Sequence, residues 1–364
     1  LRFLRRSNQN TKTFAEIIKM NSIKTLVIVI FFSISCLGQD VFQYEKNIQY
    51  IENYNSTDLE FINSKEKINL YGTLIEPKNQ YDKIIIIVPG SGMDTRNNHY
   101  QLTENLLQNN IAVFRYDERG VGKSEGKFST ANYTITDMAN DLRIIYDSLK
   151  NNIIFSTKQI GLISHSQGGM VTMILIENGI QPDFLVQWAT PVQKHGEFLK
   201  YQLRTGVNKF ENELIFDSEE KKLEIMGIFH QAFGGTSTEN DWEEDLKISK
   251  EALKKAKEHG YTEKNYNRFY YGNFHSWKHL LKKDFENTYA TCKIPILYII
   301  GSNDLYIDPK AEVNKLRSFQ NNKIEIIIIN GLNHYLTNED LSPDSMYNID
   351  IEAKKTITDW ILKQ

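Results

Sequence analysis

The 364-residue chain has little cysteine and little proline, and neither sign of charge dominates it. Its two cysteines, Cys36 and Cys292, are too few for a disulfide framework or a zinc cluster. Lysine and arginine number 43 against 46 acidic residues, so no strongly basic face is expected and nucleic acid is not an expected partner. The seven prolines form no linker, and no internal repeat or low-complexity block is present. The remainder is an ordinary globular mixture, with 12% aromatic residues available for a core or an apolar pocket.

Residues 1–38 are typical of an upstream extension followed by a secretory signal peptide. Lys24 precedes a short apolar run, Leu26–Phe32, and small residues follow near Ser35 and Gly38. The run is too short for a comfortable transmembrane helix. We therefore expect no integral membrane span after processing.

Two outcomes of processing are open. Cleavage near Gly38 or Gln39 would export the protein to the periplasm or the extracellular space, and the sequence favours this outcome. Alternatively, residues 33–36 resemble a lipobox, and Cys36 would then carry a lipid anchor; Ser33, in place of the usual leucine, weakens that case. After cleavage only Cys292 remains, so no internal disulfide is expected.

Short β-branched runs alternate with helical patterns over most of the chain. The runs are continuous and apolar, as expected of strands buried on both faces of a parallel sheet. They lie at Lys83–Val88, Ile111–Tyr116, Ile160–Ser164, Phe184–Trp188, Ile294–Ile300 and Lys323–Ile329. Helical patterns lie at Tyr100–Asn109, Ile135–Lys150, Gly168–Asn178 and Ile351–Leu362. The alternation predicts an α/β fold with a mostly parallel, doubly wound sheet.

Two segments depart from this alternation. Leu59–Ile62 and Ile68–Leu74, separated by a polar turn, predict an antiparallel hairpin at the sheet edge. Residues 191–292 contain no convincing strand and are too long for a plain loop. Charged helical patterns such as Asp241–His259 predict a helical cap over the carboxyl edge of the sheet. The predicted division is a core of residues 39–190 and 293–364, interrupted by the cap at 191–292.

Ser166 is the candidate nucleophile. It stands in Ser164-His165-Ser166-Gln167-Gly168-Gly169, where a predicted strand ends and a helix begins. Such a tight turn needs small residues beside the nucleophile and projects it above the sheet. The Gln167 backbone N–H, at the helix N-terminus, is suited to stabilising an oxyanion. The loop after Lys83–Val88 contains Ser91, whose backbone N–H we assign as the second oxyanion donor.

A serine nucleophile needs a base and a carboxylate that orients the base. Asp304 follows the predicted strand Ile294–Ile300, and His334 follows Lys323–Ile329. Both therefore fall on the same sheet edge as Ser166, with Asp308 as a nearby competitor for the carboxylate role.

From about residue 60 onward the chain resembles the α/β-hydrolase superfamily, in which the catalytic residues follow the order Ser, Asp, His. Residues 90–92, 117–124 and 164–169 resemble motifs of capped bacterial esterases, in particular the monoglyceride-lipase and serine-aminopeptidase-like group and the cinnamoyl-type esterases. The resemblance implies Ser166 as nucleophile, His334 as base and Asp304 as its orienting acid. Pro89-Gly90 replaces the common His-Gly, and Ser164 replaces the common glycine. Because these positions shape the site without transferring protons, we expect activity to survive both changes.

Three other patterns have simpler readings. Residues 120–124 resemble the end of a phosphate-binding loop, but Asp117 stands where that loop needs glycine, so we expect a structural turn in which Asp117 and Arg119 pair. His275 and His279 have metal-ligand spacing, but we expect packed or solvated cap histidines and no metal site. Aromatic residues of the cap are expected to line either the pocket or the core of the cap; they are Tyr266, Phe269, Tyr270, Tyr271, Phe274 and Trp277.

We expect an exported serine hydrolase that cleaves small-molecule carboxylic esters through an acyl-enzyme, without a metal or an organic cofactor. One alternative is a small aminopeptidase, which would need a cap carboxylate such as Glu197, Glu211 or Glu213 to hold the substrate amine. A thioesterase is disfavoured by export. Another alternative is a non-catalytic binding protein of the same fold, although no member of the triad is missing. The acyl and alcohol groups of the substrate and the oligomeric state stay open.

Overall fold

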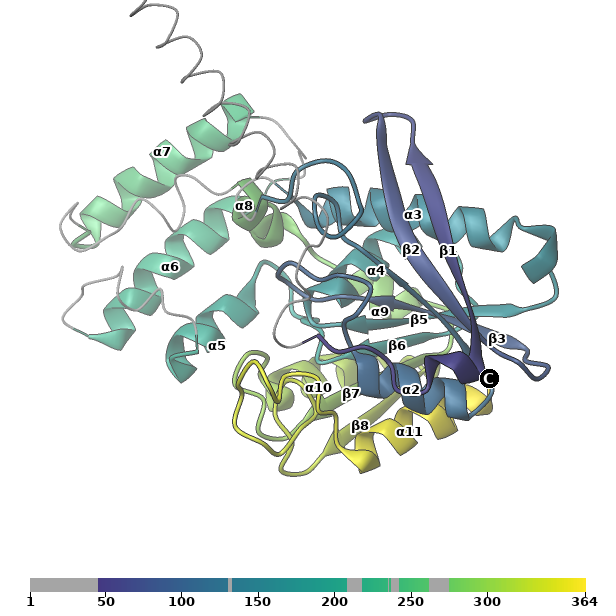
Figure 1. Ribbon diagram of the computed structural model, residues 1–364. Helices are drawn as coiled ribbons and strands as arrows, with labels where there is room; N and C mark the ends of the chain where they lie inside the picture. Colours follow the sequence, from purple (N-terminus) through teal and green to yellow (C-terminus); the bar gives the residue numbers. More distant parts are fainter. Residues whose placement is uncertain (1–44, 130–132, 208–217, 235, 237–241, 262–274) are drawn as a thin grey trace, which may run out of the picture. The chain divides into compact units, whose positions relative to one another are not determined.

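A computed structural model of the protein describes residues 45–129, 133–207, 218–234, 236, 242–261 and 275–364 (Figure 1). All of these residues belong to one compact unit, Gln43–Gln364. The predicted signal peptide and Cys36 lie outside the described residues. Across the described ranges, no helix is both long enough and apolar enough to cross a membrane.

A mixed sheet forms the centre of this unit. Its strands are β1 (Tyr54–Asn63), β2 (Ile68–Pro77), β3 (Lys83–Val88), β4 (Ala112–Tyr116), β5 (Gln159–His165), β6 (Leu185–Trp188), β7 (Ile296–Gly301) and β8 (Ile324–Ile329). They lie in the order β1-β2-β4-β3-β5-β6-β7-β8. The strands from β4 to β8 are parallel, while β1 and β2 are antiparallel to each other and β2 is antiparallel to β4. The predicted α/β fold with a mostly parallel sheet is confirmed.

The burial of each strand follows its composition. β3 has the bounds predicted for it, and five of its six residues are buried, as a continuous apolar run requires in a sheet covered on both faces. The β1–β2 hairpin lies at the sheet edge as predicted, with Tyr54 opposite Pro77 and Asn63 opposite Ile68. Both hairpin strands are longer than predicted because β1 is largely exposed, and its polar residues carry no apolar signature.

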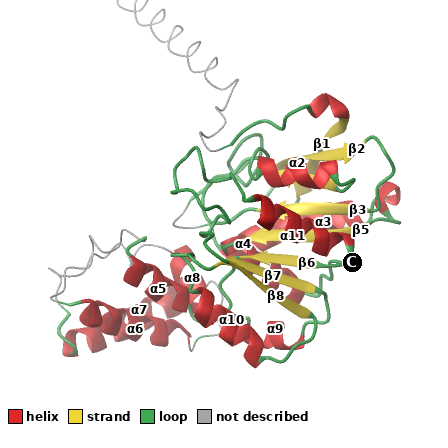
Figure 2. Ribbon diagram, turned by 90° about the horizontal axis from the view of Figure 1, so that it is seen from below, coloured by secondary structure: helices red, strands yellow, loops and turns green. Residues whose placement is uncertain are grey.

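Helices cover both faces of the sheet (Figures 1 and 2). α2 (Tyr100–Gln108) and α11 (Ile351–Leu362) pack together on one face, and α3 (Ile135–Lys150) and α4 (Gln167–Glu177) pack together on the other. α10 (Pro309–Ser318) connects β7 to β8. α3 begins where its sequence predicts because Thr134 and Asp137 form a reciprocal capping box.

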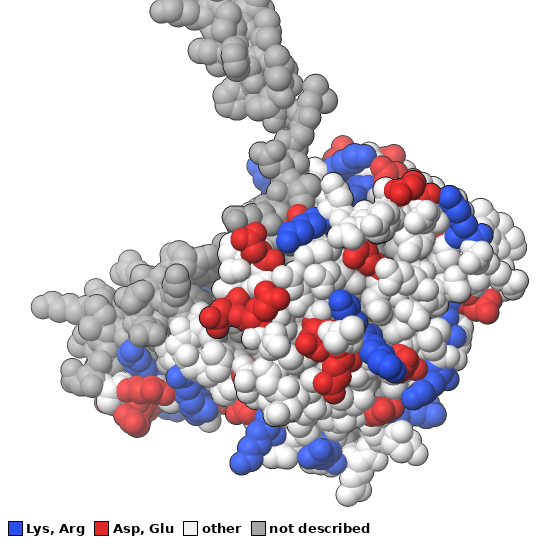
Figure 3. All heavy atoms as spheres, turned by 60° about the horizontal axis from the view of Figure 1, so that its bottom comes forward, with Lys and Arg blue, Asp and Glu red and all other residues white. Residues whose placement is uncertain are grey.

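The segment between β6 and β7 contains five helices among its described residues. They are α5 (Glu197–Thr205), α6 (Glu219–Gly234), α7 (Trp242–Glu258), α8 (His275–Lys282) and α9 (Glu286–Thr291). α6 packs against α5, α7 and α8, whereas α9 packs against α4 of the core. α7 corresponds to the predicted charged helix 241–259. On the face shown in Figure 3, acidic and basic side chains of the described residues are intermingled.

Candidate active site

Ser166 occupies a strained turn between β5 and α4. Its backbone has φ 52° and ψ −120°, a conformation that L-residues rarely adopt outside over-determined sites. The turn is held on both sides, since the Ser166 N–H donates to the Trp188 carbonyl at 2.8 Å and the Ser166 carbonyl accepts from Gly169 at 3.0 Å. A Cβ at Gly168 would lie 2.3 Å from the Pro89 carbonyl oxygen, so only glycine fits there. This is the strand–turn–helix geometry that presents a nucleophile at a sheet edge.

His334 and Asp304 form a buried hydrogen-bonded pair. The His334 Nδ1 lies 2.8 Å from Asp304 Oδ2, and the two residues are 3% and 1% exposed. The other carboxylate oxygen, Oδ1, accepts hydrogen bonds from the backbone N–H groups of Tyr306 at 2.7 Å and Ile307 at 2.9 Å. Because Nδ1 donates to the carboxylate, Nε2 is the ring nitrogen left to act as a base.

Asp308, the competing carboxylate, has a different place. Its Oδ1 accepts from the backbone N–H groups of Lys310 and Ala311, each at 3.0 Å, and so caps the N-terminus of α10. The structure therefore brings Asp304, and not Asp308, to His334.

The two assigned oxyanion donors, Ser91 and Gln167, line one cavity together with Ser166 and His334. Gln167 is the first residue of α4, where unpaired N–H groups and the helix dipole favour negative charge. Ser91 lies in the loop after β3, and the following Gly92 has φ 139°, which requires glycine. The arrangement is suited to holding a developing oxyanion beside Ser166.

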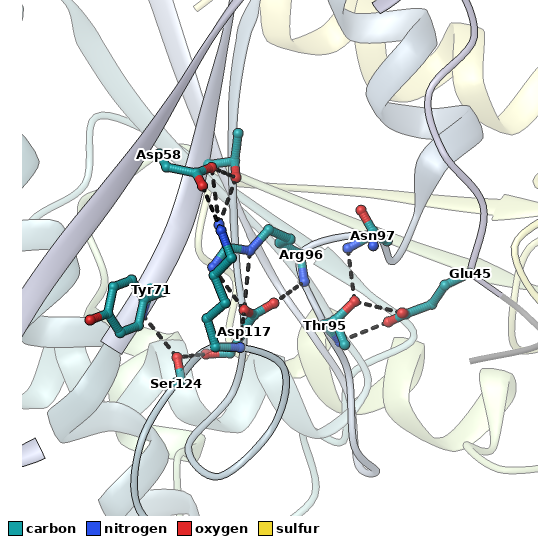
Figure 4. A network of polar contacts seen from close by, with 10 residues as sticks. Glu45, Asp58, Tyr71, Thr95, Arg96, Asn97, Asp117 and Ser124 are labelled. Carbon is teal, nitrogen blue, oxygen red and sulfur yellow. Dashed lines mark hydrogen bonds and ion pairs between the residues drawn. The ribbon is translucent and has the colours of Figure 1, made fainter. Parts of the chain in front are cut away.

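A network of charged groups anchors the loop that carries Ser91 (Figure 4). Arg96 donates to Asp117 three times: from its backbone N–H to Oδ1 at 2.8 Å, and from Nε and Nη2 to Oδ2 at 3.1 and 2.8 Å. Asp117 Oδ2 also accepts from the Lys123 backbone N–H at 2.8 Å. Arg96 reaches Asp58 on β1 as well, at 3.1 Å. Asp117 thus ties the loop after β3 to the loop after β4.

The expected pairing of Asp117 with Arg119 is wrong. Arg119 binds Glu66 and Asp141 instead, the latter through Nε at 2.9 Å and Nη2 at 2.7 Å. The reason is that a guanidinium and a carboxylate form two parallel hydrogen bonds only when they face each other, and this is achieved across the fold rather than between near neighbours in one loop. Residues 120–124 form a turn, as expected; its Lys123 pairs with Asp58, and the next helix of the described chain, α3, begins only at Ile135.

Three buried acids lie beside this network, and sequence analysis missed them. They are Glu45, Asp94 and Glu118. Thr95 donates twice to Glu45. The Asp94 backbone N–H donates to the Glu118 side chain at Oε2 (3.0 Å), and the Glu118 backbone N–H donates to the Asp94 carbonyl (3.2 Å). Burial raises the pKa of Asp94 to about 7 and raises that of Glu118 well above its usual value. The only sign of them in the sequence was their position, because Asp94 follows β3 and Glu118 follows β4, and both strands end at the site.

Uncharged aromatic side chains pack beside His334, the candidate base. The His165 ring lies 4.9 Å from that of His334 and 4.6 Å from that of Trp188, and His99 lies 5.3 Å from His165. Burial lowers the pKa of His99 to about 3 and that of His165 well below its usual value, so both are neutral at physiological pH. His334 therefore faces no second imidazolium.

The cavity has a volume of about 410 Å³ and is closed partly by the cap. Side chains from α5, from the segment after it and from α8 join residues of the core in lining it. The lining residues from the predicted cap are Pro191, Phe198, Leu199, Gln202, Val207, Ser276, Trp277 and Leu280. Trp277 thus lines the pocket, while the other five cap aromatics, Tyr266, Phe269, Tyr270, Tyr271 and Phe274, lie outside the described residues.

The remaining candidates do not join this site. Glu197 pairs with Lys200 at 2.6 Å and is not among the lining residues, and Glu211 and Glu213 lie outside the described residues. His279 is fully buried on α8, and the side chain of His275 is not described. Within the described ranges, no cluster of three or more His, Cys, Asp or Glu side chains is placed to hold a metal ion.

Helix α5 is hydrogen-bonded directly to the loop that carries Asp304. The Tyr201 hydroxyl donates to the Asp304 carbonyl at 2.9 Å, and the Thr205 hydroxyl donates to the Leu305 carbonyl at 2.6 Å. The first helix of the cap is therefore anchored to the same peptide segment that carries Asp304, the hydrogen-bond partner of His334.

Comparisons with known proteins agree with this architecture. The fold is similar to that of an esterase from Pyrococcus furiosus (18% identity, 90% of this chain and 98% of that chain covered, TM-score 0.53). It is also similar to a thermostable carboxyl esterase from Bacillus coagulans solved with glycerol (17% identity, 85% and 98% covered, TM-score 0.52). An α/β hydrolase from a Penicillium species is equally similar (17% identity, 85% and 97% covered, TM-score 0.52).

Identities this low show the fold alone. Among curated proteins, none matches the chain. The family model of the serine aminopeptidases, S33, matches residues 79–340, which is most of the chain and includes Ser166, Asp304 and His334. The protein is a hydrolase of the α/β-hydrolase fold, and it belongs to the serine aminopeptidase S33 family.

Proposed function

We propose that the protein hydrolyses carboxylic esters through a covalent acyl-enzyme on Ser166. The observation that carries this proposal is the buried His334–Asp304 pair, 2.8 Å between Nδ1 and Oδ2, at the cavity that Ser166 enters from its strained turn. A hydroxyl is a weak nucleophile unless a base removes its proton, and an oriented neutral imidazole is such a base.

The proposed reaction has two halves. His334 takes the Ser166 proton as the oxygen attacks the ester carbonyl, and Asp304 stabilises the imidazolium. The backbone N–H groups of Ser91 and Gln167 hold the tetrahedral oxyanion. His334 then protonates the leaving alcohol, and a water molecule repeats the sequence on the acyl-enzyme. Every step uses groups of this chain, without a metal or an organic cofactor.

The substrate proposed is a small ester, since a cavity of about 410 Å³ holds a ligand of modest size. We propose further that residues 1–38 direct export and are removed, with lipidation of Cys36 as the alternative. Fractionation of a bacterial host that expresses the full chain tests this point. Mature protein in the periplasm or medium supports cleavage, and recovery in membranes with incorporated palmitate supports the lipid anchor.

The test of the reaction is hydrolysis of p-nitrophenyl esters, from acetate to octanoate, by the wild type and by Ser166→Ala. Removal of a triad nucleophile is expected to lower kcat by about 10³-fold or more. Ser148→Ala, an exposed hydroxyl on α3, is the matched control and should keep the wild-type rate. Equal rates for the wild type and Ser166→Ala would overturn the assignment of Ser166.

The family match makes aminopeptidase activity the second candidate. It is tested with aminoacyl p-nitroanilides, whose cleavage by the wild type but not by Ser166→Ala would favour it. A non-catalytic binding role predicts instead that a serine-reactive fluorophosphonate leaves the wild type unlabelled.

A further inference from the structure

Asp94 is a buried carboxyl group at the candidate active site. It lies in the loop after β3, two residues beyond Gly92, and is only 5% exposed. It nevertheless lines the same cavity as Ser166 and His334. Among the described residues that line this cavity, Asp94 alone has a carboxyl group, and none is a lysine or an arginine.

The two carboxyl oxygens of Asp94 have different surroundings. Oδ1 accepts a hydrogen bond from the Tyr347 hydroxyl at 2.8 Å. Oδ2 has no hydrogen-bond partner within the described part of the chain, and the nearby buried Arg115 donates to the Asn98 carbonyl instead. Because Asp94 lines the cavity, a ligand in the cavity can supply the donor that Oδ2 lacks, and a hydrogen bond to a carboxylate in a largely buried site is favourable.

The charges around Asp94 also favour a ligand that donates a hydrogen bond to it. Burial raises its pKa to about 7, and the Glu45 carboxylate adds to the rise. Glu118, which accepts from the Asp94 backbone, is a further buried acid. A hydrogen-bond donor in the cavity would stabilise the ionised form of Asp94, and a positively charged donor would do so most strongly.

The position of Asp94 limits where that donor lies on a substrate. Asp94 and Ser91, the assigned oxyanion donor, are three residues apart, and three residues span at most about 10 Å. A donor that meets Asp94 is therefore expected within about 10 Å of the scissile carbonyl, which is within the reach of a six-carbon acyl chain.

We propose that Asp94 determines specificity by accepting a hydrogen bond from a donor group of the ester substrate, a hydroxyl or a protonated amine, close to the scissile bond. This proposal rests on the proposed ester hydrolysis at Ser166. It names the chemistry that the substrate carries besides its ester, and it places the recognition in the core rather than in the cap.

The test compares esters of matched size that differ only in the donor. The acyl series is p-nitrophenyl heptanoate, 6-hydroxyhexanoate and 6-aminohexanoate, and the alcohol series is propyl and 2-hydroxyethyl hexanoate followed by pH-stat. We expect the wild type to prefer a donor-bearing ester by about tenfold or more in kcat/KM, the value of a hydrogen bond to a charged group. The hydroxyl and amine arms show which donor is used.

Asp94→Asn should reduce this preference to about one. The Asn amide can still accept from Tyr347, but it presents an NH₂ group where the substrate needs an acceptor. Asp359→Asn, an exposed carboxylate on α11, is the matched control and should keep the wild-type ratio. A preference retained by Asp94→Asn would overturn the proposal, as would a wild-type ratio of about one in both series.

A second measurement does not depend on the folding of a variant. The wild type should treat p-nitrophenyl 6-methoxyhexanoate like the octanoate, which has the same chain length, because a methyl ether accepts but does not donate a hydrogen bond. Equal preference for the ether and the hydroxyl ester would exclude an acceptor role for Asp94. Failure of the reaction itself is distinguishable, because the wild type would then hydrolyse no ester, or Ser166→Ala would match it on the heptanoate.

Discussion

His334 Nδ1 lies 2.8 Å from Oδ2 of Asp304, and the opposite oxygen of this carboxylate is fixed by two backbone N–H groups. The carboxylate therefore cannot rotate without losing hydrogen bonds, and it holds the imidazole in one orientation. The side chain of Asp308, four residues further on, caps the N-terminus of α10 instead.

The first prediction follows from this difference. Asp304→Asn should lower kcat for ester hydrolysis by about 10³- to 10⁴-fold, because an amide at this position favours the wrong histidine tautomer. Asp308→Asn should keep full activity and stability, since asparagine is as good an N-cap as aspartate. Steady-state kinetics of both variants provide the check, and equal losses would contradict the assignment of Asp304.

The second prediction concerns the anchor of the Ser91 loop. Asp117→Asn removes the buried counter-charge of Arg96 and leaves it only the exposed Asp58, so it should cost about 3 kcal/mol in the free energy of unfolding. It should also lower kcat more than it raises KM, because the Ser91 N–H acts mainly on the oxyanion.

Asp58→Asn is the control for that variant, because Asp58 belongs to the same network but is 55% exposed. An exposed ion pair contributes at most about 1 kcal/mol, so this variant should remain close to the wild type in urea unfolding and in kcat. Similar losses in the two variants would show that the network does not act through Asp117.

The third prediction concerns pH and Glu312. This buried residue of α10 accepts hydrogen bonds from the Val192 and Gln193 backbone N–H groups, and burial raises its pKa to about 7. Between pH 4.5 and 7 the native state holds a proton that the unfolded state releases, so the Glu312 contribution to stability falls as pH rises through this window.

Glu312→Gln removes that titration. Its free energy of unfolding, relative to the wild type, should rise between pH 5 and pH 8 by on the order of 3 kcal/mol. Urea unfolding at the two pH values measures it, and Glu258→Gln, at the exposed end of α7, should keep the wild-type slope. A slope unchanged by Glu312→Gln would contradict the prediction.

The fourth prediction is that two small residues near Ser166, Gly169 and Ser164, respond to alanine substitution with opposite changes in stability. A Cβ at Gly169 would lie 2.0 Å from Thr190 Oγ1 and 2.1 Å from Gln187 Oε1, so Gly169→Ala should destabilise the protein by about 3 kcal/mol. Ser164→Ala should instead stabilise it by about 1 kcal/mol, because the buried Ser164 hydroxyl has no hydrogen-bond partner in the described chain. Thermal unfolding gives both signs, and a destabilised Ser164→Ala would refute the second.

Local patterns were enough to predict much of the core. β3, α3 and α11 begin and end where their patterns predict, because continuous apolar runs, a capping box and an amphipathic period are written in adjacent residues. The positions of Ser166, Asp304 and His334 at strand ends could be inferred in the same way, since parallel strands bring their carboxyl ends to one edge.

Contacts between distant charged residues could not be predicted in this way. Asp117 meets Arg96 and Arg119 meets Asp141 because separate loops are folded against each other, whereas proximity in sequence suggested a pair of Asp117 with Arg119. Asp94 and Glu312 gave no sign of burial either, because a charged residue in a loop or first helical turn is usually solvated. Only packing reveals such buried acids.

The hydrogen bonds from Tyr201 and Thr205 to the carbonyls of residues 304 and 305 limit how freely the cavity wall at α5 can change. Under the proposed mechanism, a displacement of α5 would move the peptide segment that carries Asp304, so we expect ligand contacts on α5 to affect proton transfer at His334. α8 lines another part of the same cavity, through Trp277 and Leu280. Replacements of Tyr201 or Thr205 that change the shape of the cavity should therefore also change the turnover rate.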